Sequence, residues 1–157
     1  MKTLVLGLGN PLVSDDSVGL RVAEALKPLL AERTDIEVDL DYWGGLRLME
    51  RMIGYDRAVV IDAICTEGEP GTIRHLKPDD IPTQRSASAH DVNLPTALQF
   101  GRQAGQHLPS DDRIFLVGIE AKDIINFSED LTPAVAEAIP RTVKQVLAMI
   151  DAFPSDD

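Results

Sequence analysis

The stretch LVLGLGNPLVSDDSVGL, residues 4–20, joins an apolar run, a glycine turn and the start of an amphipathic segment. The run over residues 3–8 is typical of a strand buried on both faces. From Val18 onward, apolar residues recur at the spacing of one helix face. A glycine turn between a strand and a helix commonly holds a phosphate, but here Asp15 and Asp16 follow the turn. Because two carboxylates would repel a phosphate, a phosphate ligand is disfavoured here.

The rest of the chain continues the alternation of strand and helix patterns. Strands are predicted over residues 3–8, 35–42, 57–64, 71–77 and 112–121, and helices over 16–30, 45–54, 91–105 and 131–153. Ser14 is expected to cap the first helix, and Thr132 the last one, with Pro133 at its first position. This order predicts an α/β fold: a three-layer α/β/α sandwich with a mostly parallel, twisted sheet of about five strands. We expect residues 1–157 to form a single domain.

Composition restricts the class of partner. The chain carries 15 basic and 26 acidic side chains, a net charge of -11, which disfavours binding to nucleic acid. Its one cysteine, Cys65, permits no intrachain disulfide and fits a reducing compartment. The N-terminus reads as a strand, not as a signal peptide, and no apolar run has the length of a membrane span. We therefore expect a cytoplasmic protein without membrane contact.

Two known motifs begin like GLGNP, residues 7–11, but this chain continues neither. A dinucleotide site needs a third glycine at a set spacing, and the chain lacks it. Peptidyl-tRNA hydrolases also share a strand followed by GLGNP, yet that resemblance stops after Pro11. An acidic surface is also unsuited to tRNA. Both interpretations are therefore disfavoured.

A metal site is the best remaining candidate from the residues alone. Asp16 opens the first helix, Asp62 follows the apolar run of the third strand, and His90 precedes a later helix. Two carboxylates and one imidazole suit zinc, nickel or a similar divalent ion, with coordination positions left for water or substrate. Each residue also has an ordinary structural alternative, such as a helix-dipole partner, a turn cap or a solvated loop residue.

Other polar residues are expected to have ordinary roles. Asp15 reads as a first-turn acid favoured by the helix dipole. His75 and His107 read as surface or packing residues. A nucleophile pair of Cys65 and His90 is conceivable, but the sequence around Cys65 has no recognisable nucleophile elbow.

The chain resembles the hydrogenase maturation endopeptidases, which trim the large subunit of nickel-iron hydrogenases. The resemblance runs in order through LVLGLGNPLVSDDSVGLRVAEAL, VVIDAI, HDVNLPTAL and LVGIEAKDIINFSEDLTPAVAEAIP, and so covers nearly the whole chain. It implies that Asp16, Asp62 and His90 are the metal ligands and the catalytic residues. It also answers the question raised by the glycine turn, because the carboxylate after the turn would meet a cation.

The resemblance further implies a substrate and a metal. The substrate would be a hydrogenase large-subunit precursor that already holds nickel, and its short C-terminal extension would be removed. The nickel would be that of the substrate, although zinc or cadmium could occupy the same site. Cleavage could use a metal-polarised carbonyl or water, or a carboxylate as general base, and the sequence does not choose between them. A nickel-binding checkpoint protein without peptidase activity is the alternative. We expect a monomer.

One loop departs from the family pattern. Many members carry Asp-Gly-Gly-Thr after the second strand, whereas this chain reads DLDYWGGLRLM over residues 39–49. Asp41, Trp43, Gly44 and Gly45 of this loop are predicted to bind substrate. The departure leaves the partner hydrogenase open, and Trp43 suits either a protein contact or a core position.

Overall fold

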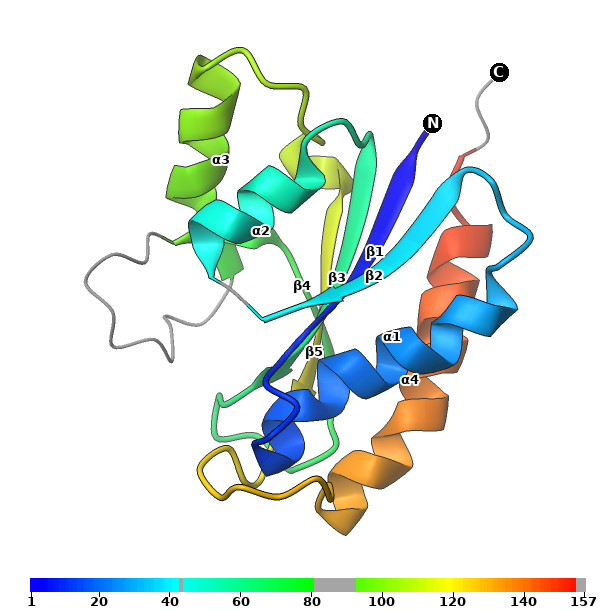
Figure 1. The fold of residues 1–157 in the computed structure, drawn as a ribbon, viewed down its shortest axis with the longest axis vertical. Helices are drawn as coiled ribbons and strands as arrows, with labels where there is room; N and C mark the ends of the chain where they lie inside the picture. The colour runs from blue at the N-terminus through cyan, green and yellow to red at the C-terminus, as the bar shows by residue number, and fades with distance from the viewer. Residues whose placement is uncertain (43, 81–92, 155–157) are drawn as a thin grey trace.

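A computed structural model describes residues 1–42, 44–80 and 93–154 of the chain. Its centre is one five-stranded sheet in the order β2-β1-β3-β5-β4 (Figure 1). The strands are β1 (Thr3–Leu8), β2 (Ile36–Asp41), β3 (Arg57–Ile64), β4 (Ile73–Leu76) and β5 (Ile114–Glu120). Four of them run parallel, and β4 pairs antiparallel with β5 at one edge. The predicted mostly parallel sheet of about five strands is confirmed.

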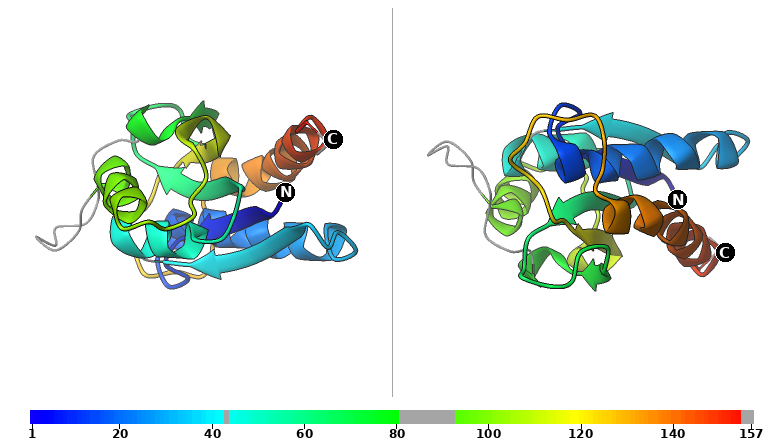
Figure 2. Two further views of the ribbon diagram at one scale, coloured as in Figure 1. Left: turned by 90° about the horizontal axis from the view of Figure 1, so that it is seen from above. Right: turned by 90° about the horizontal axis from the view of Figure 1, so that it is seen from below.

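Helices cover both faces of the sheet, as the two views along the sheet show (Figure 2). The helices are α1 (Val18–Leu29), α2 (Gly45–Met52), α3 (Leu94–Gln103) and α4 (Pro133–Asp151). Helices α1 and α4 pack on one face, around a core that includes Val5, Val59 and Val117. Helices α2 and α3 pack on the other face, around Leu4, Val60 and Leu116. The predicted three-layer α/β/α sandwich is confirmed.

The presence of a core on each face of the sheet explains the apolar runs in the sequence. All six residues of β1 are buried, and so are seven of the eight residues of β3. Successive side chains of a strand point to opposite faces, so a strand covered on both faces needs apolar residues at nearly every position. Edge strand β4, by contrast, is only partly buried. Among the described residues, no helix combines the length and apolar composition needed to cross a membrane.

Two local expectations need correction. Ser14 does not cap α1, because a short 3-10 helix, Ser14–Ser17, precedes α1 and Ser17 occupies the N-cap position. The Ser14 hydroxyl instead donates to the carbonyl oxygen of Asp130. The expected place of Asp62 at the mouth of its strand also needs adjustment, because Asp62 lies opposite Gly118 of β5 and β3 continues for two more residues. Thr132 and Pro133 do begin α4 as predicted, although the Thr132 side chain makes no capping bond.

The order of the strands defines where a ligand would bind. From β1 the chain crosses to β2 on one side, and it later reaches β3, which pairs with the other side of β1. The carboxyl ends of β1 and β3 therefore flank a topological switch point, the usual place for a ligand in an open parallel sheet. We call this end of the parallel strands the carboxyl edge and the opposite end the amino edge.

Candidate functional site at the carboxyl edge

The glycine turn folds back on itself directly after β1. Gly9 has a positive φ of 154°, and a Cβ at this position would lie 2.1 Å from the backbone oxygen of Asp16. The turn can close this tightly only because residue 9 has no side chain. Asn10 shapes its other half, since its side-chain oxygen accepts from the Leu12 N–H at 3.0 Å. The glycine and asparagine of the opening stretch therefore build a turn, not a phosphate cradle.

That turn places Asp16 at the switch point. The Asp16 carboxylate accepts a hydrogen bond from the backbone N–H of Asn10 at 3.0 Å, and its side chain is partly exposed. One turn later, Gly19 lets α1 pack closely against the sheet: a Cβ there would lie 2.3 Å from the carbonyl oxygens of both Leu8 and Ile61. Asp62 directly follows Ile61. The segments that carry Asp16 and Asp62 therefore meet at the carboxyl ends of β1 and β3.

Asp62 is the only partly exposed residue among the buried neighbours of its strand. One of its carboxylate oxygens accepts from the backbone N–H of Ala63 at 2.8 Å. A carboxylate within a covered strand destabilises the fold unless it has a partner or faces solvent, because burial disfavours its charge. Its place at the switch point is consistent with a role in binding a cation or a substrate.

Asp15 has a different role from that of Asp16. Its role also differs from that of the first-turn acid that the sequence suggested. Its side chain is fully buried and accepts four hydrogen bonds. The donors are the backbone N–H groups of Lys122, Asp123 and Thr132, at 2.8–2.9 Å, and the Thr132 hydroxyl at 2.8 Å. Asp15 therefore fastens the turn after β1 to the loop after β5. This tie also explains why Thr132 does not cap α4 with its own hydroxyl.

Glu120 is a second buried acid of this edge, and sequence reasoning missed it. It ends β5 and is 1% exposed. Its carboxylate accepts from the backbone N–H and the hydroxyl of Thr66 and lies 3.6 Å from the Arg74 guanidinium. Glu120 thereby holds the loop after β3 against the end of β5. The signal was present in the sequence, since an acid directly after an apolar run is the same pattern that singled out Asp62.

The predicted substrate-binding loop after β2 begins with an ion pair. Asp41 is 9% exposed and accepts from the Arg47 guanidinium at 3.0 Å and from the Tyr42 N–H at 2.8 Å. Gly44 is the N-cap of α2 and Gly45 its first residue, so the glycine pair starts a helix. Trp43 lies outside the described residues. Substrate binding by these four residues stays a prediction.

The third predicted metal ligand, His90, also lies outside the described residues. Within the described ranges, no group of three or more His, Cys, Asp or Glu side chains is arranged to hold a metal ion. The structure thus brings the segments of Asp16 and Asp62 to one edge and leaves the place of His90 open. Two carboxylates at one edge are a donor set that fits a divalent cation when a third ligand comes from elsewhere.

The remaining titratable candidates have the ordinary roles expected of them. His75 is exposed on β4 and hydrogen-bonds Gln145, and His107 is exposed and pairs with Asp56. The N–H of Lys2 and the imidazole of His107 together lower the pKa of the Asp56 carboxyl. Cys65 is exposed directly after β3.

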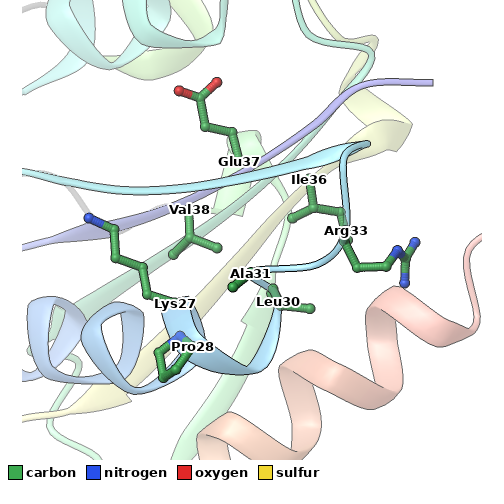
Figure 3. A pocket seen from close by; sticks show the side chains of 8 residues that line it. All are labelled: Lys27, Pro28, Leu30, Ala31, Arg33, Ile36, Glu37 and Val38. Carbon is green, nitrogen blue, oxygen red and sulfur yellow. The ribbon is translucent and has the colours of Figure 1, made fainter.

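Two hollows on the described surface lie at the amino edge, away from these acids. One of about 460 Å³ lies between the end of α1 and the start of β2, where Lys27, Leu30 and Val38 line it (Figure 3). The other, of about 270 Å³, lies among Thr3, Arg57 and the end of α4. Neither contains Asp16 or Asp62. We place the site at the switch point, because parallel sheets bind ligands at their carboxyl ends.

Comparison with known proteins gives a consistent result. A family model described as hydrogenase maturation protease matches residues 20–149. The chain is 29% identical over 153 residues to the hydrogenase 2 maturation protease of Escherichia coli, covering 96% of this chain and 91% of that protein. It is 27% identical over 152 residues to a putative hydrogenase maturation protease of Methanocaldococcus jannaschii, covering 94% and 92%.

Solved structures agree with these sequence matches. The hydrogenase maturating endopeptidase from E. coli superposes with a TM-score of 0.75 at 29% identity, covering 96% of this chain and 93% of that one. A nickel-iron hydrogenase maturation protease from Thermococcus kodakarensis superposes with a TM-score of 0.72 at 23% identity, covering 96% and 92%. The second match extends the likeness of fold only.

Proposed function

This chain belongs to the hydrogenase maturation protease family, and we propose that it removes the C-terminal extension from the precursor of a nickel-iron hydrogenase large subunit. The family match makes it a peptidase of hydrogenase maturation. The finer parts of the proposal are that cleavage follows nickel insertion and that the protein recognises the bound nickel. The observation that supports them is that the segments carrying Asp16 and Asp62 meet at the switch point.

In this proposal the nickel belongs to the substrate. Asp16 and Asp62 would each offer a carboxylate oxygen to it, and His90 would offer an imidazole nitrogen. The same three residues would accept zinc or cadmium in isolation, because carboxylate and imidazole donors suit these ions as well. Binding a metal that the partner already holds makes cleavage conditional on a loaded precursor. A carboxylate beside the scissile bond can also take a proton from the attacking water.

The first experiment tests the reaction itself. The protein is co-expressed with hydrogenase large-subunit precursors, and the mass of each precursor is measured. A mass loss equal to a C-terminal extension is expected with one of them. If the protein binds a precursor without any mass loss, the alternative of a nickel-binding checkpoint protein without peptidase activity replaces the proposal.

The second experiment tests recognition of nickel. A precursor is purified with and without nickel, and each form is incubated with protein from which metals have been stripped. Only the nickel-loaded precursor should be cleaved, because the residues of the protein would bind the nickel that the precursor holds. Cleavage of both forms at the same rate would contradict nickel recognition while leaving the peptidase activity in place.

A further inference from the structure

The carboxyl edge gathers most of the large apolar side chains that the described part of the chain exposes. Five of eight follow strand ends at this edge: Leu12 after β1, Tyr42 and Leu46 after β2, and Ile125 and Phe127 after β5. Ile125 and Phe127 are the most exposed of all, at 81% and 83%. Scattered apolar residues on a surface are ordinary, but their concentration at one edge indicates a protein contact.

The backbone that carries Ile125 and Phe127 forms a hydrogen-bonded turn. The Asp123 carboxylate accepts from the backbone N–H groups of Ile125 at 3.1 Å and Asn126 at 3.0 Å. Its other oxygen accepts from the Asn126 side chain at 2.8 Å. These bonds, led by the Asn126 N–H, lower the pKa of Asp123. The two apolar side chains are therefore presented by an ordered turn.

The same turn is fastened to the segment after β1. Val13 and Phe127 form an antiparallel bridge, and the Ser128 N–H donates to the Leu12 carbonyl at 3.0 Å. The two loops lie side by side when the molecule is viewed from below (Figure 2). Buried Asp15 also ties the base of both loops together. A preorganised apolar surface loses little conformational entropy on binding, which favours a role as an anchor.

The charged residues around Leu12, Ile125 and Phe127 restrict the charge that a partner can carry. In the described loops that follow β1, β3 and β5, the exposed charged residues are four acids and one base: Glu67, Glu69, Lys122, Glu129 and Asp130. The exposed Arg21 of α1 adds a second base beside them, because its guanidinium donates to the Glu129 carbonyl. A second copy of this chain would bring the same acidic loops against themselves. A partner with basic residues around an apolar patch would complement them.

We propose that Leu12, Ile125 and Phe127 form a docking surface for the folded body of the precursor large subunit. This inference rests on the proposed function. The surface adjoins the site, because the Leu12 N–H bonds the Asn10 side chain and the Asn10 N–H bonds the Asp16 carboxylate. A precursor whose C-terminal extension reaches Asp16 would therefore bring its body close to this edge. We expect an apolar patch with a basic surround on the precursor.

The test compares binding and cleavage of the nickel-loaded precursor. The double variant Ile125→Ser, Phe127→Ser should bind the precursor at least about tenfold more weakly, as expected for exposed aromatic and aliphatic anchors. Its kcat at saturating precursor should equal that of the wild type, because neither residue belongs to the site. The matched control is Phe100→Ser, which removes a side chain that is 63% exposed on α3. Its affinity should not change, and thermal unfolding should show all three proteins folded.

Three outcomes would overturn the docking surface: unchanged affinity of the double variant, an equal loss in Phe100→Ser, or a lower kcat at unchanged KM. Failure of the proposed function looks different. If the wild-type protein binds the precursor but never cleaves it, the peptidase proposal fails while the binding comparison still decides the docking surface. If the wild-type protein binds no precursor, both are wrong.

Discussion

The two edges of the sheet differ in what they offer a ligand. The amino edge has two hollows, of about 460 and 270 Å³, but their lining is an assortment of apolar side chains and scattered charges. The carboxyl edge has neither of those hollows, yet it has Asp16, Asp62 and the exposed apolar side chains of its loops. An enzyme that acts on a folded protein needs a surface its partner can reach. In the proposed function, chemistry and exposure mark the site, and cavity volume does not.

The carboxyl edge is held together by two close backbone approaches and by one buried acid. Gly9 and Gly19 permit close backbone approaches that a side chain would block, and the buried Asp15 joins two loops far apart in sequence. At the amino edge, by contrast, Arg33 pairs with Asp35 close to the surface, where an ion pair contributes little to stability. Substitutions at the fastened edge should therefore have the larger effects.

The largest effect is expected from Gly19→Ala. The added methyl group would lie 2.3 Å from two carbonyl oxygens of the sheet, which cannot move without separating α1 from β1 and β3. We expect a loss of about 3 kcal/mol or more in the free energy of unfolding, measured by urea denaturation. Gly54→Ala is the control. It meets no atom within 4 Å but has a φ of 91°, so it should cost only about 1–2 kcal/mol. Equal losses would mean that the close approach at Gly19 is not needed.

A smaller effect is expected from Asp15→Asn. The asparagine keeps the size of the side chain, but its amide N–H would face one of the four groups that now donate hydrogen bonds to Asp15. Hydrogen bonds to a buried charge contribute about 1.5–3 kcal/mol, so we expect a loss of about that size in the free energy of unfolding. Asp16→Asn, whose side chain is partly exposed and can still accept from the Asn10 N–H, should lose less than about 1 kcal/mol. The reverse order would contradict the distinct roles of these adjacent acids.

The central strands and helices were predictable because their patterns are local. β1 and β3 are covered on both faces, so their residues are apolar almost throughout, and α1 repeats apolar residues at helical spacing. The direction of β4 was not predictable. It has four residues and is only partly buried, so its pattern does not show which way it pairs.

The candidate site was predictable only in part, because its long-range bonds leave no local trace. The segments of Asp16 and Asp62 were expected to meet at one edge, and they do. The burial of Asp15 depends on donors more than 100 residues away, at positions 122, 123 and 132. The Ser14 hydroxyl, which was expected to cap a helix, donates instead to the carbonyl oxygen of Asp130, 116 residues away. Metal binding by Asp16, Asp62 and His90 stays a prediction.

One measurement tests the central claim that the chemistry belongs to the carboxyl edge. The initial rate of cleavage of a nickel-loaded precursor is compared for the wild type, Asp62→Asn and Lys27→Ala. Asp62→Asn keeps an oxygen that can accept the Ala63 N–H and loses the anionic donor, so the rate should fall at least about 100-fold. Lys27→Ala alters the larger hollow of the amino edge, and its rate should stay within about twofold of the wild type. A rate near that of the wild type for Asp62→Asn, or a large loss for Lys27→Ala, would contradict the claim.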